Sequence, residues 1–163
     1  MASRTTVLVH GNPETSAIWE PLTAALTERG RSKVIALSPP GFGSPVPDGF
    51  DPTMAGYADW LVGELDAISA TGTEIDLLGH DWGAGHVYGA LSRRPDLVRT
   101  WASDIAGLHH RDYVWHDMAQ AWQTPDVGEQ AIEGMTSVAY ADKVALYEGL
   151  GLPSSMAAQL ASA

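Results

Sequence analysis

Residues 77–85 read LLGHDWGAG, a stretch that places Asp81 between glycines directly after an apolar run. The spacing of Gly79, Asp81 and Gly83 is typical of the strained strand-to-helix corner that presents a nucleophile above a parallel sheet. A simpler interpretation is that Asp81 is only the N-cap of the following helix, because aspartate is favoured at that position. Residues 79–83 alone leave both interpretations open.

The rest of the chain supplies the alternating pattern that such a corner needs. Four short runs rich in β-formers are separated by segments with helical period: residues 5–10, 33–38, 74–79 and 100–106. This alternation predicts an α/β fold with a parallel sheet of about four strands in the order 2-1-3-4, covered by helices on both faces. From about residue 109 only helical patterns remain. We therefore expect an α/β region over residues 1–108 and a helical segment over residues 109–163.

Two of the expected helices begin at local signals. Asp51 followed by Pro52 is typical of an N-cap with proline at the first helical position. The third helix is expected to open near Trp82 and to end at the Arg93-Arg94-Pro95 stop. This helix would carry Asp81 at its beginning.

The predicted strand order makes the first and third strands neighbours, so the loops that follow them meet at the carboxyl edge of the sheet. HGNP (residues 10–13) would then lie beside GHDWG (residues 79–83). In that crevice the backbone N–H groups of Asn12 and Trp82 can converge on an oxyanion, and their side chains can donate to a halide or an oxygen. The residues expected to support the two loops are His10, Gly11, Pro13, Gly79, His80 and Gly83.

An aspartate at this corner implies different chemistry from a serine. A carboxylate attacks an sp³ carbon by in-line displacement and leaves an alkyl-enzyme ester, which water must later cleave. The leaving group is then a halide or the oxygen of a strained ring. Hydrolysis of ordinary esters is a weaker alternative, because no serine occupies the corner. A non-catalytic interaction module is the alternative of a different class.

Composition argues against several kinds of partner. The 163 residues contain 9 Lys and Arg against 20 Asp and Glu, and the net charge of −11 would repel nucleic acid and anionic membranes. There is no cysteine, and the six histidines show no metal-ligand spacing, so neither a metal site nor a cofactor is expected. We see no signal peptide and no apolar run of about 20 residues. These features predict a cytoplasmic protein that acts on a small molecule.

Three segments carry a resemblance to a known family: VLVHGNPETSAIW (residues 7–19), SPPGFGSP (38–45) and LLGHDWGAG (77–85). In this order and spacing they resemble the α/β-hydrolase superfamily, in its aspartate-nucleophile branch of epoxide hydrolases and haloalkane dehalogenases. The resemblance covers residues 5 to about 108, and the later helices look like the start of the family's cap. It implies that Asp81 is the nucleophile and that Asn12 and Trp82 supply the oxyanion hole and the leaving-group donors.

The chain also departs from the pattern of this family. Family members continue into further strands and then a histidine that activates the hydrolytic water, whereas no histidine occurs here after His116. We therefore expect the chain to be the N-terminal portion of a longer hydrolase, with its fourth strand left as an apolar edge. Such an edge could instead pair with a second copy in a homodimer. Ser38 is a smaller departure, because many members carry an acid there.

One acidic residue and one histidine after the fourth strand are further candidates for a catalytic role. Asp104 and His109 follow the fourth strand at the same end of the sheet as Asp81, and they could form a makeshift acid–histidine pair. Helix capping and solvated surface are the commoner fates of such residues. His86 lies a turn or more into the third helix and is expected to be structural.

Overall fold

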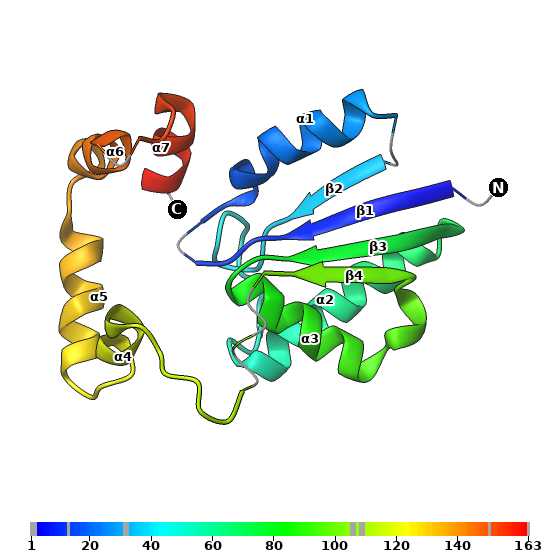
Figure 1. Ribbon diagram of the computed structural model, residues 1–163. Coiled ribbons are helices and arrows are strands. Elements are labelled where there is room, and N and C mark those ends of the chain that lie inside the picture. The colour runs from blue at the N-terminus through cyan, green and yellow to red at the C-terminus, as the bar shows by residue number, and fades with distance from the viewer. Residues whose placement is uncertain are drawn as a thin grey trace. The chain divides into compact units, whose positions relative to one another are not determined.

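The computed structural model describes residues 3–12, 14–30, 33–104, 107, 110–149 and 151–162, and four of these are described by their backbone alone: 118, 135, 159 and 160. Its centre is a four-stranded parallel sheet of order β2-β1-β3-β4 (Figure 1), which confirms the predicted order. The strands are β1 (Ser3–Val9), β2 (Lys33–Leu37), β3 (Thr73–Gly79) and β4 (Thr100–Ser103).

The register of the strands aligns their carboxyl ends. Val9, the last residue of β1, is paired with Leu37 on one side and with Gly79 on the other, and Gly79 is paired in turn with Ser103. All four strands therefore end at one edge of the sheet. The loops after β1 and β3 leave that edge side by side, as the sequence predicts.

Helices cover both faces of the sheet. In Figure 1, α1 lies on one face, and α2 and α3 lie together on the other. The bounds of these helices, with two short 3₁₀ turns, are η1 (Ser16–Trp19), α1 (Glu20–Glu28), α2 (Met54–Ser69), α3 (Trp82–Arg93) and η2 (Pro95–Leu97). The core lies between the sheet and the α2/α3 pair, where fully buried aliphatic side chains of β1 and β3 meet those of both helices: Val7, Val9, Leu61, Leu65, Ile75, Leu77 and Val87. Burying side chains of this size stabilises the fold by about 1.5–3 kcal/mol each.

The predicted start of α2 was wrong by two residues. The N-cap is Thr53, whose hydroxyl accepts a hydrogen bond from the Gly56 N–H. The Asp51 side chain accepts bonds from the Thr53 N–H and hydroxyl instead. Both residue types cap helices well, so a second capping residue directly after Pro52 moved the start of the helix.

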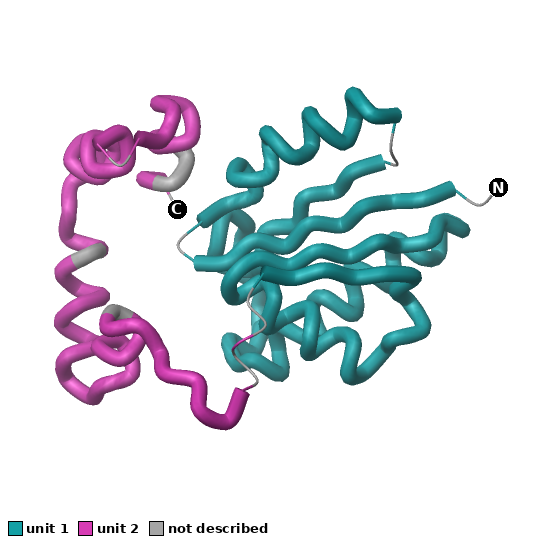
Figure 2. The backbone as a smooth tube through the Cα atoms, in the orientation of Figure 1, with its two compact units in different colours: residues 1–105, 163 teal, residues 106–162 magenta. Residues whose placement is uncertain are grey.

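Residues 106–162 form a second compact unit, separate from the unit of residues 1–105 with residue 163 (Figure 2). Within it α4 packs on α5, and α6 packs on α7. The bounds are α4 (Asp117–Trp122), α5 (Val127–Ser137), α6 (Tyr140–Gly149) and α7 (Ser154–Ala161). In the described part of the chain, no helix is both long and apolar enough to cross a membrane.

Candidate active site

Asp81 lies at a strained corner between β3 and α3. Its backbone has φ 50° and ψ −124°, a conformation that costs a non-glycine residue about 1–3 kcal/mol. Asp81 occupies the N-cap position of α3, but its side chain makes no capping hydrogen bond. The capping interpretation therefore does not explain this carboxylate, which is directed elsewhere.

Three glycines make the corner possible by allowing close backbone approach. A Cβ added at Gly83 would lie 2.6 Å from the His10 carbonyl oxygen, and one added at Gly79 would lie 2.7 Å from the Gly83 carbonyl oxygen. At Gly11, a Cβ would lie 2.5 Å from the Cβ of Asp81. Side chains at these positions would push apart β1, β3 and the start of α3. The glycines of both sequence segments thus serve the same close contact.

The loop after β1 reaches the Asp81 carboxylate, as expected from the strand order. The backbone N–H of Asn12 donates to Oδ2 of Asp81 over 3.1 Å. Trp82 is the first residue of α3, and its side chain is exposed. The role of the Trp82 backbone N–H as a second oxyanion donor stays a prediction, as do the leaving-group roles of the two side chains.

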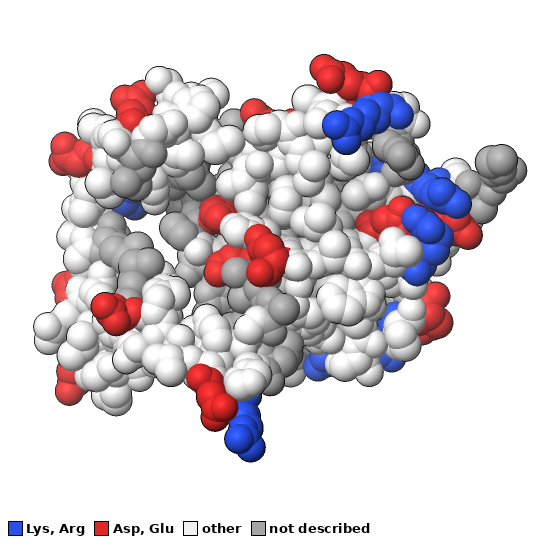
Figure 3. Space-filling model, viewed as in Figure 1, with Lys and Arg blue, Asp and Glu red and all other residues white. Residues whose placement is uncertain are grey.

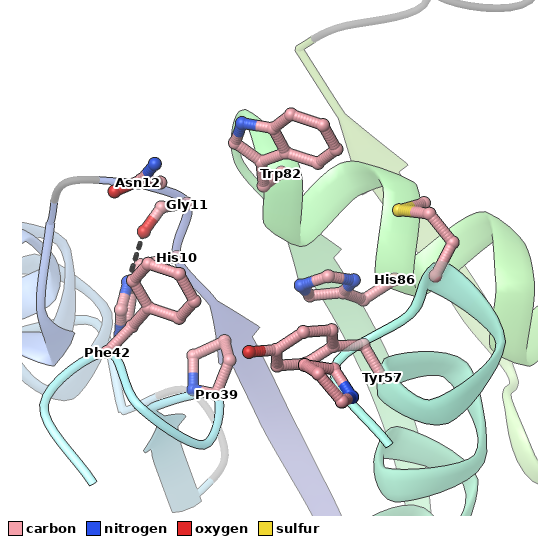
Figure 4. A pocket seen from close by; sticks show the side chains of 10 residues that line it. His10, Gly11, Asn12, Pro39, Phe42, Tyr57, Trp82 and His86 are labelled. Carbon is pink, nitrogen blue, oxygen red and sulfur yellow. Dashed lines mark hydrogen bonds between the residues drawn. The ribbon is translucent and has the colours of Figure 1, made fainter. Parts of the chain in front are cut away.

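A cavity of about 460 Å³ lies beside Asn12 and Trp82, at the same edge of the sheet as Asp81 (Figure 4). In the figure Gly11 and Asn12 face Trp82 across the cavity, with Pro39, Tyr57 and His86 deeper in it. Asp81 itself is not a lining residue, but its hydrogen-bond partner Asn12 and the next residue in the chain, Trp82, are. The described residues that line the cavity are His10, Gly11, Asn12, Pro39, Phe42, Pro52, Met54, Tyr57, Trp82 and His86. Most of these groups are apolar, as in typical small-molecule sites.

His10 supports the first loop from a fully buried position. Its Nδ1 lies 2.8 Å from the Gly11 carbonyl oxygen (dashed in Figure 4), which requires a proton on Nδ1. Nε2 then accepts from the Ser38 hydroxyl at 3.1 Å. Burial lowers the pKa of His10, which keeps the ring neutral. Ser38 thus fixes the ring that holds the loop.

His80 lies on the other side of the β3 end, in a cluster with two carboxylates. Its Nδ1 is hydrogen-bonded to Asp104, and its Nε2 lies 3.1 Å from Glu14, which also accepts from the Gly11 N–H at 3.1 Å. Partial burial opposes protonation of His80, but the two carboxylates outweigh it and raise its pKa. The structure therefore pairs Asp104 with His80. The other half of the expected Asp104 pair, His109, lies outside the described residues, as does Pro13.

His86 is the residue that the sequence did not identify as part of the site. It comes from the second turn of α3, is 4% exposed and lines the cavity. Its ring stacks on Tyr57 with centroids 4.7 Å apart and an angle of 16°. Its Nδ1 is buried without a partner among the described residues, and burial lowers its pKa to about 4. In the sequence, His86 stands after the small residues that follow Asp81 at the start of α3, and this position is the feature that could have indicated its place in the site.

Phe42 and Tyr57 also line the cavity without having been predicted. Phe42 belongs to the PPGFG turn after β2, and Tyr57 belongs to α2, where its period suggests only a core position. The Tyr57 hydroxyl donates to the Pro40 carbonyl over 2.8 Å, which ties α2 to that turn. In the part of the chain that the structure describes, no three acidic or histidine side chains gather as a metal site would require.

Sequence comparison identifies a matching protein family and several relatives. Residues 6–158 match the family described as "Alpha/beta hydrolase family". "Probable oxidoreductase EphD" of Mycobacterium tuberculosis is 34% identical over 130 residues, which are 73% of this chain and 21% of that protein. A haloalkane dehalogenase of Mesorhizobium japonicum is 29% identical over 80% of this chain and 44% of its own length. An epoxide hydrolase of Caballeronia sordidicola is 35% identical over 55% of this chain and 27% of its own. The chain therefore spans less than half of each of these relatives.

Solved structures show the same architecture. Cfl2 of Burkholderia cenocepacia matches with a TM-score of 0.69 at 19% identity, over 98% of this chain and 57% of that one. A loop variant of the haloalkane dehalogenase DbeA of Bradyrhizobium elkanii matches with a TM-score of 0.55 at 29% identity, over 78% of this chain and 46% of that one. The fold of the chain thus belongs to an architecture with solved examples.

Proposed function

Because the chain belongs to the alpha/beta hydrolase family and is related to haloalkane dehalogenases and epoxide hydrolases, we propose that Asp81 attacks a haloalkane or an epoxide and forms a covalent ester. The observation that carries this proposal is the environment of its carboxylate. The side chain does not cap α3, and it accepts a bond from the Asn12 N–H beside an apolar cavity. A carboxylate held in this way retains lone pairs for attack.

In the first step a carboxylate oxygen of Asp81 forms a bond to an sp³ carbon of the substrate. The carbon–halogen bond breaks, and its electron pair leaves with the halide. With an epoxide, the carbon–oxygen bond of the ring breaks, and the ring oxygen takes a proton from a water molecule to become a hydroxyl group, which leaves a hydroxide ion in solution. The side chains of Asn12 and Trp82 are the proposed donors to the leaving atom, since both line the cavity.

In the second step water attacks the carbonyl carbon of the Asp81 ester. Negative charge then develops on a carboxyl oxygen of Asp81, and the Asn12 N–H, which donates to Oδ2, is the proposed donor that stabilises it. Collapse of this intermediate releases an alcohol or a diol and restores the carboxylate. The attacking water gives one of its protons to the departing alkoxide oxygen, and its other proton passes to the solvent.

Intact-mass spectrometry tests the proposal directly. The protein is incubated separately with bromohexane and with styrene oxide, and the mass of the chain is followed over time. We expect one alkyl group per chain, located on the peptide that contains Asp81. In oxygen-18 water, each completed hydrolysis introduces a solvent oxygen into the Asp81 carboxylate, so turnover is seen even when the adduct does not accumulate.

Two variants make this experiment decisive. Asp81→Ala removes the nucleophile, whereas Asp59→Asn changes an exposed carboxylate on α2. The proposal requires labelling of wild type and Asp59→Asn but not of Asp81→Ala. An adduct that persists in Asp81→Ala, or wild-type protein that neither forms an adduct nor incorporates solvent oxygen, would refute it.

The sheet edge favours a second candidate, an interaction module. β4 is the last strand in the sheet order, and its Trp101 side chain is 53% exposed. An exposed strand edge with an apolar side chain is a template for strand pairing. Sedimentation velocity over a range of concentrations tests this candidate: a dimer that Trp101→Glu abolishes supports it, and a monomer at all concentrations excludes pairing between copies.

A further inference from the structure

The polar atoms of His86 are unusual in a cavity whose walls are mostly apolar. We propose that His86 is a specificity-determining residue that hydrogen-bonds a hydroxyl or other neutral oxygen of the substrate, so that the site selects uncharged molecules with one polar group on an apolar body. This inference rests on the proposed function of Asp81 and names the substrate class for the same cavity.

The first argument is the unmet hydrogen-bonding capacity of His86. The residue is 4% exposed, lines the cavity, and has a buried Nδ1 without a partner among the described residues. Buried polar atoms are almost always paired, and an exception calls for a reason. His10, the other buried histidine of the cavity, follows this rule, because the Gly11 carbonyl and the Ser38 hydroxyl bind its two ring nitrogens. Nδ1 itself is closed off from the cavity, because less than 1 Å² of its surface is accessible. A ligand would therefore reach His86 through the ring edge that borders the cavity, where the protein provides an imidazole in a mostly apolar wall.

The second argument is the fixed orientation of the ring. His86 stacks on Tyr57, and the Tyr57 hydroxyl is itself anchored to the Pro40 carbonyl. In Figure 4 the edge of the His86 ring that carries a nitrogen points into the space between α3 and the turn that bears Pro39 and Phe42. A ring held in this way selects ligands by the position of their oxygen, because it loses little freedom on binding.

The third argument concerns charge. Burial holds the pKa of His86 at about 4, so the ring is neutral near pH 7. The titratable groups near the ring are His10, Tyr57 and Asp81. The pKa of His10 is lowered and the pKa of Tyr57 is raised. The negative charge of Asp81 favours protonation of His86 but does not offset the effect of its burial. Among the described residues that line the cavity there is no lysine or arginine. An anionic ligand would therefore find no cationic side chain among them.

The distribution of basic residues leads to the same conclusion. On the face of the sheet unit seen in Figure 3, blue side chains gather toward the end where the chain begins. In the described residues of this unit, the basic side chains lie at the amino ends of strands, near them in adjoining turns or at the ends of helices: Arg4, Arg29, Lys33, Arg93, Arg94 and Arg99. The cavity lies at the opposite, carboxyl ends of the strands. A neutral imidazole and apolar walls select for a neutral molecule.

The chemistry of neutral imidazole sets the preferred polar group. One ring nitrogen donates and the other accepts, so a hydroxyl can pair with whichever faces the cavity. The rings of Phe42, Tyr57 and Trp82 provide surface for the apolar body of the ligand. Benzyl alcohol, toluene and benzoate therefore form a matched series that varies only the polar group.

The test measures dissociation constants for these three probes by ligand-observed NMR. None of them carries a halide or an epoxide, so binding does not depend on the reactivity of Asp81. We expect benzyl alcohol to bind about 3- to 10-fold more tightly than toluene, which is the range for one hydrogen bond. Benzoate should bind more weakly than benzyl alcohol. Equal binding of all three by wild type would overturn the proposal.

Two variants identify the group responsible. His86→Phe keeps a ring against Tyr57 but removes both nitrogens, so the preference for benzyl alcohol over toluene should fall to about one. His86→Gln keeps a donor and an acceptor and should retain part of the preference. His110→Leu changes an exposed histidine of the helical unit and serves as the control. A preference that survives in His86→Phe would refute the role of His86.

The outcome is separable from that of the proposed function. A His86-dependent preference without any label on Asp81 would support the cavity assignment and refute the covalent chemistry. Labelling of Asp81 without a His86-dependent preference would support the covalent chemistry and refute the role of His86. Circular dichroism of each variant identifies unfolding. If His86→Phe is unfolded, the comparison of His86→Gln with wild type decides. A folded His86→Gln that has lost the preference for benzyl alcohol over toluene contradicts the proposal.

Discussion

His80 and Asp81 are adjacent in sequence, yet their side chains have opposite surroundings at the end of β3. His80 is hydrogen-bonded to Asp104 and Glu14, so charge on that side is compensated within the protein. On the other side Asp81 accepts one backbone N–H, from Asn12, and Asn12 lines an apolar cavity. Two adjacent residues thus hold an ion cluster on one side of the strand end and, on the other, a carboxylate whose hydrogen-bond donor is a backbone N–H.

This difference indicates how a carboxylate and the ion cluster that supports the neighbouring loop can share one corner. The His80 cluster joins the ends of β3 and β4 to the loop after β1, because Glu14 also binds the Gly11 N–H. Gly11 in turn lies against Asp81. The charged side therefore holds the geometry, and the other side keeps its carboxylate free of a cation.

Replacing an aspartate by asparagine on each side of the corner, at Asp81 and at Asp104, should give the largest difference in the rate of alkylation. We expect Asp81→Asn to slow alkylation by bromohexane by roughly 1,000-fold or more, because an amide is a far weaker nucleophile. Asp104→Asn should slow it by a few fold at most, since Asp104 acts through His80. Mass spectrometry over a time course gives both rates. Equal losses in the two variants would contradict the division between the two sides.

The close approach of the strands at the corner is tested by Gly83→Ala. The added methyl group would meet the His10 carbonyl, so we expect about 3 kcal/mol of lost stability together with slower labelling of Asp81. Urea unfolding measures the loss. Gly63→Ala is the matched control, because a Cβ there meets nothing within 4 Å on α2, and this change should stabilise the protein by about 0.5–1 kcal/mol. An unchanged midpoint for Gly83→Ala would show that the corner can relax.

The buried ring on the cavity side predicts a loss of stability in acid. The pKa of His86 is lowered to about 4 from 6.5, so the folded protein binds fewer protons than the unfolded chain between these values. The free energy of unfolding should therefore fall as the pH drops from 6.5 toward 4, with a contribution of up to about 1.4 kcal/mol per pH unit from this residue. His86→Phe removes that contribution. Urea unfolding of both proteins at several pH values gives the free energy of unfolding of wild type minus that of the variant, and this value must decrease as the pH falls from 6.5 toward 4.

The charged side predicts the opposite pH dependence and a smaller effect. The pKa of His80 is raised, so the stability gained from its carboxylate partners is fully present below 6.5 and is lost as the pH rises through the folded pKa. Asp104→Asn should lower the pKa of His80 and cost about 0.5–1 kcal/mol near pH 6, since both side chains are partly exposed. NMR titration of the imidazole protons reports the pKa. A pKa that stays raised in the variant would assign the effect to Glu14 alone.

Much of the fold follows from local sequence patterns. The alternation of apolar strands and helical segments predicted the parallel sheet and its order, and the structure confirms both. The glycine spacing around Asp81 predicted the corner, because few residues other than glycine tolerate such close backbone approach. The start of α2 was misplaced because Asp51 and Thr53 are both good caps, and local preference does not rank them.

The amino-acid sequence thus determined which residues form the sheet and where the nucleophile candidate stands, since hydrophobic period and glycine spacing act over short distances. The tertiary structure alone decided which partners the polar side chains found. Asn12 and Asp81 lie 69 residues apart, and His80 and Asp104 lie 24 apart, so their contacts arise only when the strand ends align. The place of His86 in the cavity depends in the same way on Tyr57 from another helix, because burial and stacking are properties of the packed protein.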